Sequence, residues 1–117
     1  MFILAVITLL FVAIFHLAGY RAYIVSSESM KNVFNTGDVI ITRKTDIDLL
    51  QKDDIITFRR TNTNIIITHR ITEIDDETGF IYTKGDANET SDADPVLPAN
   101  VFGVYKGKIT FFKFIFK

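Results

Sequence analysis

The sequence predicts a mainly β protein, in which a small β-barrel domain follows one N-terminal transmembrane helix. Two observations carry this prediction. The stretch from Phe2 to Tyr20 contains no residue with a formal charge, and such a run is typical of a membrane helix. The residues after it form short β-rich runs that are separated by polar turns. We therefore divide the chain into a membrane anchor at residues 1–22 and a β-rich domain at residues 23–117.

The overall composition narrows the class of protein. The chain has 117 residues, a net charge of −1 and 48% hydrophobic residues, and its mean hydropathy of +0.23 is high for a soluble protein. A near-neutral charge without a basic stripe argues against nucleic acid as a partner. Because the chain contains no Cys, disulfides, zinc–thiolate sites and thiol nucleophiles are excluded, and Ser, Thr and Lys remain as candidate nucleophiles.

The apolar N-terminal stretch has the length of a membrane span. At about 1.5 Å per residue, a helix from Phe2 to Tyr20 is about 29 Å long, close to the thickness of the hydrocarbon core. A cleaved signal peptide needs a basic start and a shorter apolar core, but the first basic residue is Arg21. A buried helix of a soluble protein is the other alternative, and the remaining chain is too short to enclose it. We therefore expect a single-pass anchor in a lipid bilayer.

The β-rich domain is predicted from alternating apolar runs and from turn residues between them. The turns are expected at residues 35–38, 52–54, 61–64 and 75–79. The predicted strands are Tyr23 to Val25, Val39 to Arg43, Ile55 to Arg60, Ile65 to Ile74, Phe80 to Thr83, Val101 to Tyr105, and Lys108 to about Phe114.

Two serines lie directly after the anchor, within the run Ser26-Ser27-Glu28-Ser29-Met30. On an extended backbone Ser27 and Ser29 point the same way, so both side chains can face one reacting group. One of them can attack while the other donates a hydrogen bond to the developing oxyanion. A serine-rich stretch after a helix is also typical of a solvated turn or a cap.

A histidine lies within a predicted strand of strongly apolar character. Alternation places His69 on the same face as Ile65, Ile67 and Ile71, which indicates a position at the boundary of the core. A hydrogen-bonded core histidine is the structural interpretation of this pattern. The functional interpretation is a general base whose imidazole is held in place by packing.

The polar loop from Lys84 to Pro95 is rich in carboxylates. Counting an EF-hand from Asp86 places Ser91 where Gly is needed and Leu97 where Glu is needed, so a calcium loop of that type is excluded. The loop is either an ordinary acidic turn or the source of a carboxylate that orients His69. Asn88-Glu89-Thr90 also matches a glycosylation sequon.

In this order, and after an N-terminal anchor, these segments resemble signal peptidase I. The resemblance is closest to the endoplasmic-reticulum, archaeal and Gram-positive sporulation-type branch, which uses a histidine where most bacterial enzymes use a lysine. It covers most of the chain from Val25 to Pro95. The matching segments are Ser27-Glu28-Ser29-Met30, Gly37-Asp38-Val39-Ile40, Asp54-Ile55-Ile56-Thr57-Phe58, His69-Arg70-Ile71, and Lys84-Gly85-Asp86-Ala87-Asn88 with Asp92.

The resemblance implies a site of the Ser-His-Asp type without a cofactor or a metal ion. Ser29 is the expected nucleophile and His69 its general base. Ser27 is expected to contribute a hydroxyl to the oxyanion hole beside the backbone N–H of Ser29. Asp92 matches the triad acid, and Asp86 matches a further acidic residue of the same segment. General chemistry agrees, since a serine hydroxyl needs an adjacent base and the base needs an orienting partner.

The sequence departs from the family pattern in two places near the serines and at the C-terminus. Glu28 stands where the family usually has glycine, and no proline follows Met30. A second, C-terminal membrane helix of many members is missing. The final residues, Ile109 to Lys117, are predicted instead to form an aromatic strand at the membrane surface, with Lys113 and Lys117 at the level of the lipid headgroups.

The expected function is that of a membrane-anchored serine endopeptidase that removes signal peptides from exported preproteins, cutting after small residues. The catalytic domain is expected outside the cytoplasm, at the cell membrane or the endoplasmic-reticulum membrane, with preprotein signal peptides, the bilayer and membrane proteins as partners. One alternative is a non-catalytic anchored β-domain that binds peptide or a partner protein. Another is an autoproteolytic regulator of the repressor-cleavage type, but that type uses a lysine base and needs no anchor.

Overall fold

The computed structural model describes residues 1–110 and consists of one helix followed by six strands. The mainly β class is therefore confirmed. Two short 3-10 helices, Ile47–Leu49 and Pro98–Asn100, connect strands. The principal elements are α1 (Phe2–Leu17), β1 (Tyr20–Ile24), β2 (Val39–Arg43), β3 (Ile55–Arg59), β4 (Ile66–Ile74), β5 (Ile81–Lys84) and β6 (Val101–Ile109).

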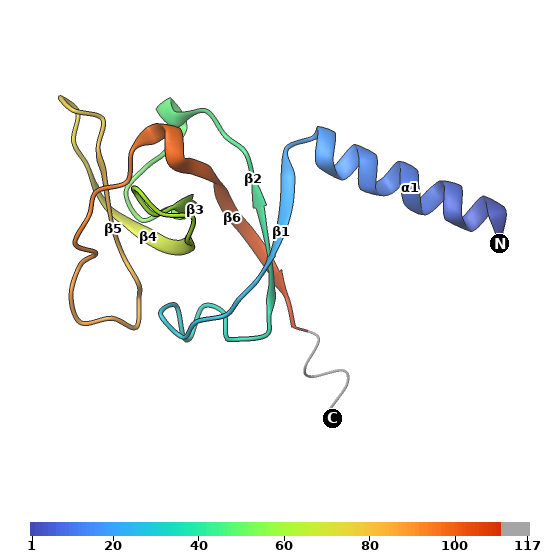
Figure 1. The fold of residues 1–117 in the computed structure, drawn as a ribbon, viewed down its shortest axis with the longest axis horizontal. Helices are drawn as coiled ribbons and strands as arrows, with labels where there is room; N and C mark the ends of the chain where they lie inside the picture. The colour runs from blue at the N-terminus through green and yellow to red at the C-terminus, as the bar shows by residue number, and fades with distance from the viewer. Residues whose placement is uncertain (111–117) are drawn as a thin grey trace.

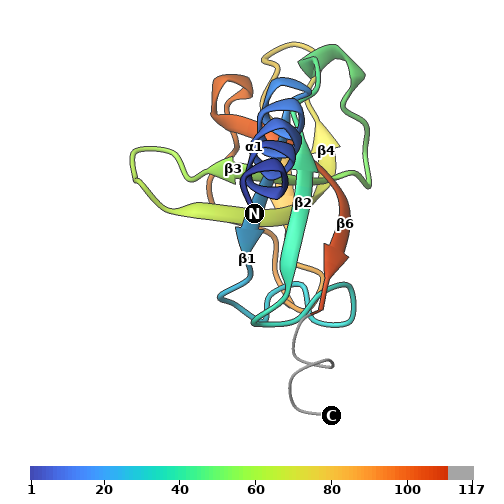
Figure 2. The ribbon, with the colours of Figure 1, turned by 90° about the vertical axis from the view of Figure 1, so that its right-hand side faces the viewer.

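All six strands belong to one antiparallel sheet with the order β1-β2-β6-β3-β4-β5. The sheet is strongly twisted, so that β3 and β4 run across the direction of β1, β2 and β6 (Figure 2). These pairings leave β1 and β5 at the two edges. Within residues 1–110 the strand pairings thus define an open, curled sheet, and none of them joins β1 to β5 to close the predicted barrel.

Strand β6 corrects the sequence prediction of two separate C-terminal strands. It runs without interruption from Val101 to Ile109 and pairs with β2 on one side and β3 on the other. Opposite β2 the register passes from Tyr105 to Gly107, which leaves Lys106 as the extra residue of a bulge. The break that the sequence predicts between two strands corresponds to this bulge. The rest of the predicted last strand, including Lys113 and Lys117, lies outside the described residues.

The N-terminal helix is shorter than the apolar stretch that predicts it. It ends at Leu17, because Gly19 adopts a φ of +89°, a conformation that only glycine adopts at little cost, and Tyr20 already pairs with Arg43 of β2. Within residues 1–110, the structure contains no helix with both the length and the apolar character needed to cross a bilayer. The predicted transmembrane span is therefore not confirmed.

Helix α1 projects from the β-domain (Figure 1). None of its residues is buried, although they are almost all apolar. Its C-terminal end contacts the sheet through the ring of Phe15, which stacks on that of Tyr20 at a centroid distance of 5.3 Å. The helix therefore leaves a continuous apolar surface outside the core of the domain.

Two apolar clusters form the core of the domain. One joins β3, β4 and β5 and consists of Leu50, Ile56, Phe58, Ile71, Ile81 and Val96. The other consists of Val25, Met30, Phe34, Ile40 and Ile55 and pins the connection between β1 and β2 against the sheet. Burial of these side chains holds an otherwise irregular segment in place.

Candidate active site

Ser29 lies in the connection between β1 and β2, which its apolar neighbours hold in position. Met30 is 1% exposed and Phe34 is 2% exposed. The ends of the connection are joined by backbone hydrogen bonds from Val25 to Asp38 and from Gly37 to Val25, both of 2.9 Å. Ser29 itself is partly exposed. Its side chain is thus fixed at the surface by residues buried beneath it.

Three predicted site residues lie in one chain of contacts. The Oγ of Ser29 lies 2.9 Å from Nε2 of His69, and Nδ1 of His69 lies 2.6 Å from Oδ2 of Asp92. A carboxylate accepts hydrogen bonds only, so the ring proton lies on Nδ1 and Nε2 is left to accept the serine hydroxyl. This arrangement suits removal of the hydroxyl proton by the imidazole.

His69 is held by its strand and by the core. It lies in β4 opposite Ile56 of β3, and its ring meets the ring of Phe58 edge-on at a centroid distance of 6.4 Å. The residue is 7% exposed. The predicted position at the boundary of the core is therefore confirmed, and the packing restricts the ring to one orientation.

The carboxylate of Asp92 contacts a threonine hydroxyl as well as the imidazole of His69. Thr83 Oγ1 donates a 2.6 Å hydrogen bond to Oδ2, and the backbone N–H of Asp92 donates to the carbonyl of Thr83 at 2.9 Å. Thr83 is 1% exposed. The acid of the irregular loop is thus attached at two points to the end of β5.

Asp86 does not contact His69 and pairs instead with Arg70. Its two carboxylate oxygens accept 2.9 and 2.8 Å hydrogen bonds from Nε and Nη2 of the guanidinium. These hydrogen bonds hold the pKa of Asp86 below its usual value and raise the pKa of Arg70. Arg70 also donates to the carbonyl of Asp53 at 2.8 Å. The pair therefore links the start of the acidic loop to β4 and to the turn before β3.

The acidic loop packs directly against the backbone of the Ser29 segment. The N–H of Ala87 donates to the carbonyl of Ser29 at 2.8 Å, and the N–H of Asp86 approaches the sulfur of Met30 at 3.2 Å. A Cβ added to Gly85 would lie 2.8 Å from the Ser29 carbonyl oxygen and 3.0 Å from His69 Nε2. Glycine at this position thus permits the close approach of the two segments.

Ser27 lies beside Ser29, as the two-residue spacing predicts. Its Oγ donates to Ser29 Oγ at 3.1 Å and accepts the backbone N–H of Ser29 at 3.1 Å. The two donors predicted for an oxyanion hole are therefore engaged with serine oxygens in this structure. An oxyanion that displaces the Ser27–Ser29 contact would find both donors, which are two residues apart in the sequence, 3.1 Å from each other.

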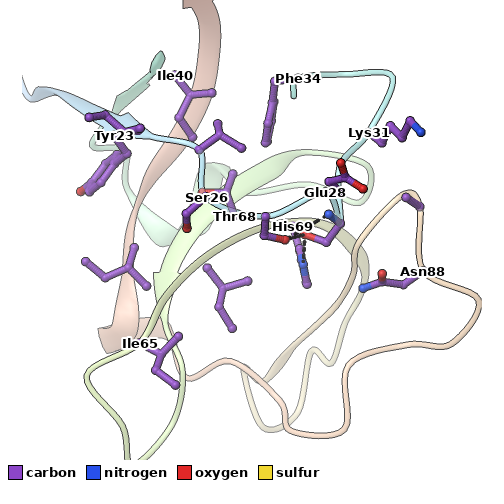
Figure 3. A pocket seen from close by; sticks show the side chains of 17 residues that line it. Tyr23, Ser26, Glu28, Lys31, Phe34, Ile40, Ile65, Thr68, His69 and Asn88 are labelled. Carbon is purple, nitrogen blue, oxygen red and sulfur yellow. Dashed lines mark hydrogen bonds between the residues drawn. The ribbon is translucent and has the colours of Figure 1, made fainter. Parts of the chain in front are cut away.

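A cavity of about 970 Å³ surrounds Ser29 and His69 (Figure 3). One part is lined by Tyr23, Ile40 and Ile65, and another by Glu28 and Lys31. The cavity is large enough to hold several residues of an extended peptide. No group of three or more His, Asp or Glu side chains among residues 1–110 has the arrangement that a metal ion needs.

Sequence reasoning did not identify Thr83, Gly85 or the partner of Asp86. One signal was available for Thr83, since it alternates with Ile81 in β5 and both face the core, at 1% exposure each. A buried hydroxyl on such a face needs a hydrogen-bond partner. Local sequence carries no signal for the close approach at Gly85, because its neighbours there come from two other segments.

The chain matches no family model. Its sequence is 41% identical over 92 residues to signal peptidase I W of Bacillus subtilis (strain 168). The aligned region covers 76% of this chain and 48% of that relative, so the chain spans about half the length of the relative. This similarity supports the signal peptidase I family.

Proposed function

We propose that this chain belongs to the signal peptidase I family and is a membrane-anchored serine endopeptidase that removes signal peptides from exported preproteins. The observation that carries this proposal is the chain of contacts from Ser29 Oγ through the imidazole of His69 to the carboxylate of Asp92. The similarity to a signal peptidase I over three quarters of the chain supports the substrate class.

In the proposed reaction, Ser29 Oγ attacks the carbonyl carbon of the scissile peptide bond while Nε2 of His69 takes the hydroxyl proton. Asp92 orients the ring and stabilises the imidazolium. The Ser27 hydroxyl and the Ser29 N–H bind the oxyanion of the tetrahedral intermediate. His69 then gives its proton to the leaving amine, and an acyl-enzyme ester remains on Ser29. Water hydrolyses this ester by the same steps.

The cavity supports an extended substrate with small residues before the cut. Residues 23–29 and residues 65–69 line the cavity, and Ser29 and His69 are the last residues of these two segments. A peptide laid between them would present one carbonyl to Ser29. We propose that small side chains are selected because larger ones cannot enter beside the packed Ser29 segment, and that the reaction needs no cofactor.

We propose that the exposed apolar surface of α1 anchors the domain in the membrane, with the domain on the extracytoplasmic side. The absence of buried residues in α1 supports a lipid environment for its side chains. In sealed vesicles, the β-domain should be digested by added protease only from the extracytoplasmic side, and α1 should remain with the membrane fraction. Recovery of the domain on the cytoplasmic side would overturn this part of the proposal.

The central test is cleavage of a preprotein by the wild type, by Ser29→Ala and by Ser26→Ala. Ser26 lines the same cavity but is not part of the chain of contacts, so it controls for loss of a serine hydroxyl nearby. Ser29→Ala should reduce cleavage to background and abolish labelling by a fluorophosphonate, whereas Ser26→Ala should retain both. Cleavage by Ser29→Ala at the wild-type rate would refute Ser29 as the nucleophile. A wild type that neither cleaves nor labels would favour a non-catalytic peptide-binding domain.

A further inference from the structure

The cavity around Ser29 has two ends that differ in chemistry. Tyr23 and Ile65 lie on one side of His69, whereas Glu28, Lys31 and Asn88 lie on the other (Figure 3). Ile24 and Ile66, whose side chains are exposed and apolar, directly follow Tyr23 and Ile65 in the sequence and also line the cavity. A peptide that crosses the cavity would therefore pass from an apolar end to a polar and charged end.

Glu28 brings an unpaired charge to the polar end. Glu28 is exposed and directly precedes Ser29 in the sequence. Within residues 1–110 the ion pairs are His69–Asp92 and Arg70–Asp86, so the carboxylate of Glu28 has no cationic partner there. Lys31 lies nearby, but the contact between the two residues is a backbone hydrogen bond of 3.0 Å from its N–H to the Glu28 carbonyl.

We infer that the polar end binds the residues that follow the scissile bond, and that Glu28 makes the enzyme favour Lys or Arg over Asp or Glu there. This inference rests on the proposed function. The apolar part of a signal peptide precedes the cleavage site and suits the end with Tyr23 and Ile65. The chain after the cut must then leave past Glu28, whose carboxylate attracts a cationic side chain and repels an anionic one.

The expected size of the preference follows from the exposure of Glu28. Charge pairs at exposed sites change an equilibrium or rate constant by up to about fivefold. Attraction raises kcat/KM for a substrate with Lys, and repulsion lowers it for a substrate with Glu. The two effects multiply, so we expect a ratio of about threefold to twentyfold between the two kcat/KM values. The preference should shrink as salt is raised, because exposed charges are screened.

The test uses three peptides that share one signal-peptide segment and carry Lys, Gln or Glu at the first position after the cut. The ratio of kcat/KM for the Lys and Glu peptides is measured for the wild type and for Glu28→Gln. Comparing ratios within one variant removes differences in the amount of folded enzyme. Lys31→Gln is the matched control, since it removes a charge of opposite sign from the same end of the cavity.

The wild type should prefer the Lys peptide, Glu28→Gln should bring the ratio close to one, and Lys31→Gln should keep or increase it. Equal rates for the three peptides with the wild type at low salt would overturn the inference and leave the proposed function intact. An unchanged preference in Glu28→Gln would also overturn it. Failure to cleave any of the peptides would instead overturn the proposed function, and the inference with it.

Discussion

Thr83 Oγ1 donates a 2.6 Å hydrogen bond to Oδ2 of Asp92, the carboxylate oxygen that also lies 2.6 Å from Nδ1 of His69. Asp92 lies in an irregular loop, whereas Thr83 is part of β5 and almost fully buried. The hydroxyl therefore ties Asp92 to the sheet. In the proposed reaction Thr83 would act through Asp92 and His69, since its hydroxyl contacts Asp92 and not Ser29.

Thr83→Val should lower turnover by about tenfold or more, because hydrogen bonds to charged groups contribute about 1.5 kcal/mol or more. Valine keeps the branched shape and the strand preference. Thr57→Val is a suitable control, since Thr57 is also buried but its hydroxyl contacts Thr68. Thr83→Ser should recover much of the activity. Equal turnover in the Thr83→Val and Thr57→Val proteins would show that the hydrogen bond from Thr83 to Asp92 does not contribute to turnover.

Asp92→Asn should lower turnover by up to about ten-thousandfold, by analogy with serine-protease triads. The amide can donate to Nδ1 and so favour the tautomer in which Nε2 carries the proton and cannot accept the Ser29 hydroxyl. Melting temperature should change little compared with turnover. A nearly wild-type Asp92→Asn enzyme beside a stable but inactive Asp86→Asn enzyme would reverse our assignment of the two carboxylates.

Asp86→Asn should affect stability in a pH-dependent way. The hydrogen bonds from Arg70 lower the pKa of Asp86 in the folded state, so the pair stabilises the fold above the ordinary Asp pKa of about 3.9 and loses this effect as the pH falls through the lowered value. The wild type should melt at most a few degrees higher than Asp86→Asn above about pH 5, and the difference should vanish in stronger acid. Asp48 is exposed and forms no ion pair among residues 1–110. In Asp48→Asn the difference in melting temperature from the wild type should therefore not depend on pH in this way.

Gly85→Ala should damage the site, whereas Gly107→Ala should not. The new Cβ at residue 85 would lie 2.8 Å from the Ser29 carbonyl oxygen, but at residue 107 it would meet nothing within 4 Å. Displacing the Ser29 segment or the loop by about 1 Å can cost about a hundredfold in turnover. Turnover of both proteins is compared at a temperature where circular dichroism shows them folded. Comparable activity in the two variants would mean that the loop does not set the position of Ser29.

Ser27→Ala should be milder than Ser29→Ala. Loss of one oxyanion donor costs about 2.7–4 kcal/mol, or roughly a hundredfold to a thousandfold in kcat, whereas loss of the nucleophile removes the acyl-enzyme route. Single-turnover acylation measures the step directly. If Ser29→Ala retained cleavage while Ser27→Ala abolished it, the roles of the two serines would be exchanged.

Much of the local structure is determined by the sequence on its own. The period of two in Ile65 to Ile74 predicts a strand with His69 on its inner face, and the structure agrees at His69 and Ile71, which are both buried, whereas Ile65 is exposed and precedes the strand. The prediction of β2 from Val39 to Arg43 is confirmed at both ends. The two-residue spacing of Ser27 and Ser29 likewise predicts that their side chains lie together, although the structure brings them into contact at the start of a turn and not on an extended strand.

Only the tertiary structure determines which residues from distant segments contact one another. Asp86 and Asp92 share one loop and are chemically alike, and only the pairing of Arg70 with one and of His69 and Thr83 with the other separates them. The close approach at Gly85 depends on two segments brought together by long-range packing, so no local pattern contains it. The bulge that joins two predicted strands into β6 depends in the same way on β2, because only a paired strand defines the register from which Lys106 departs.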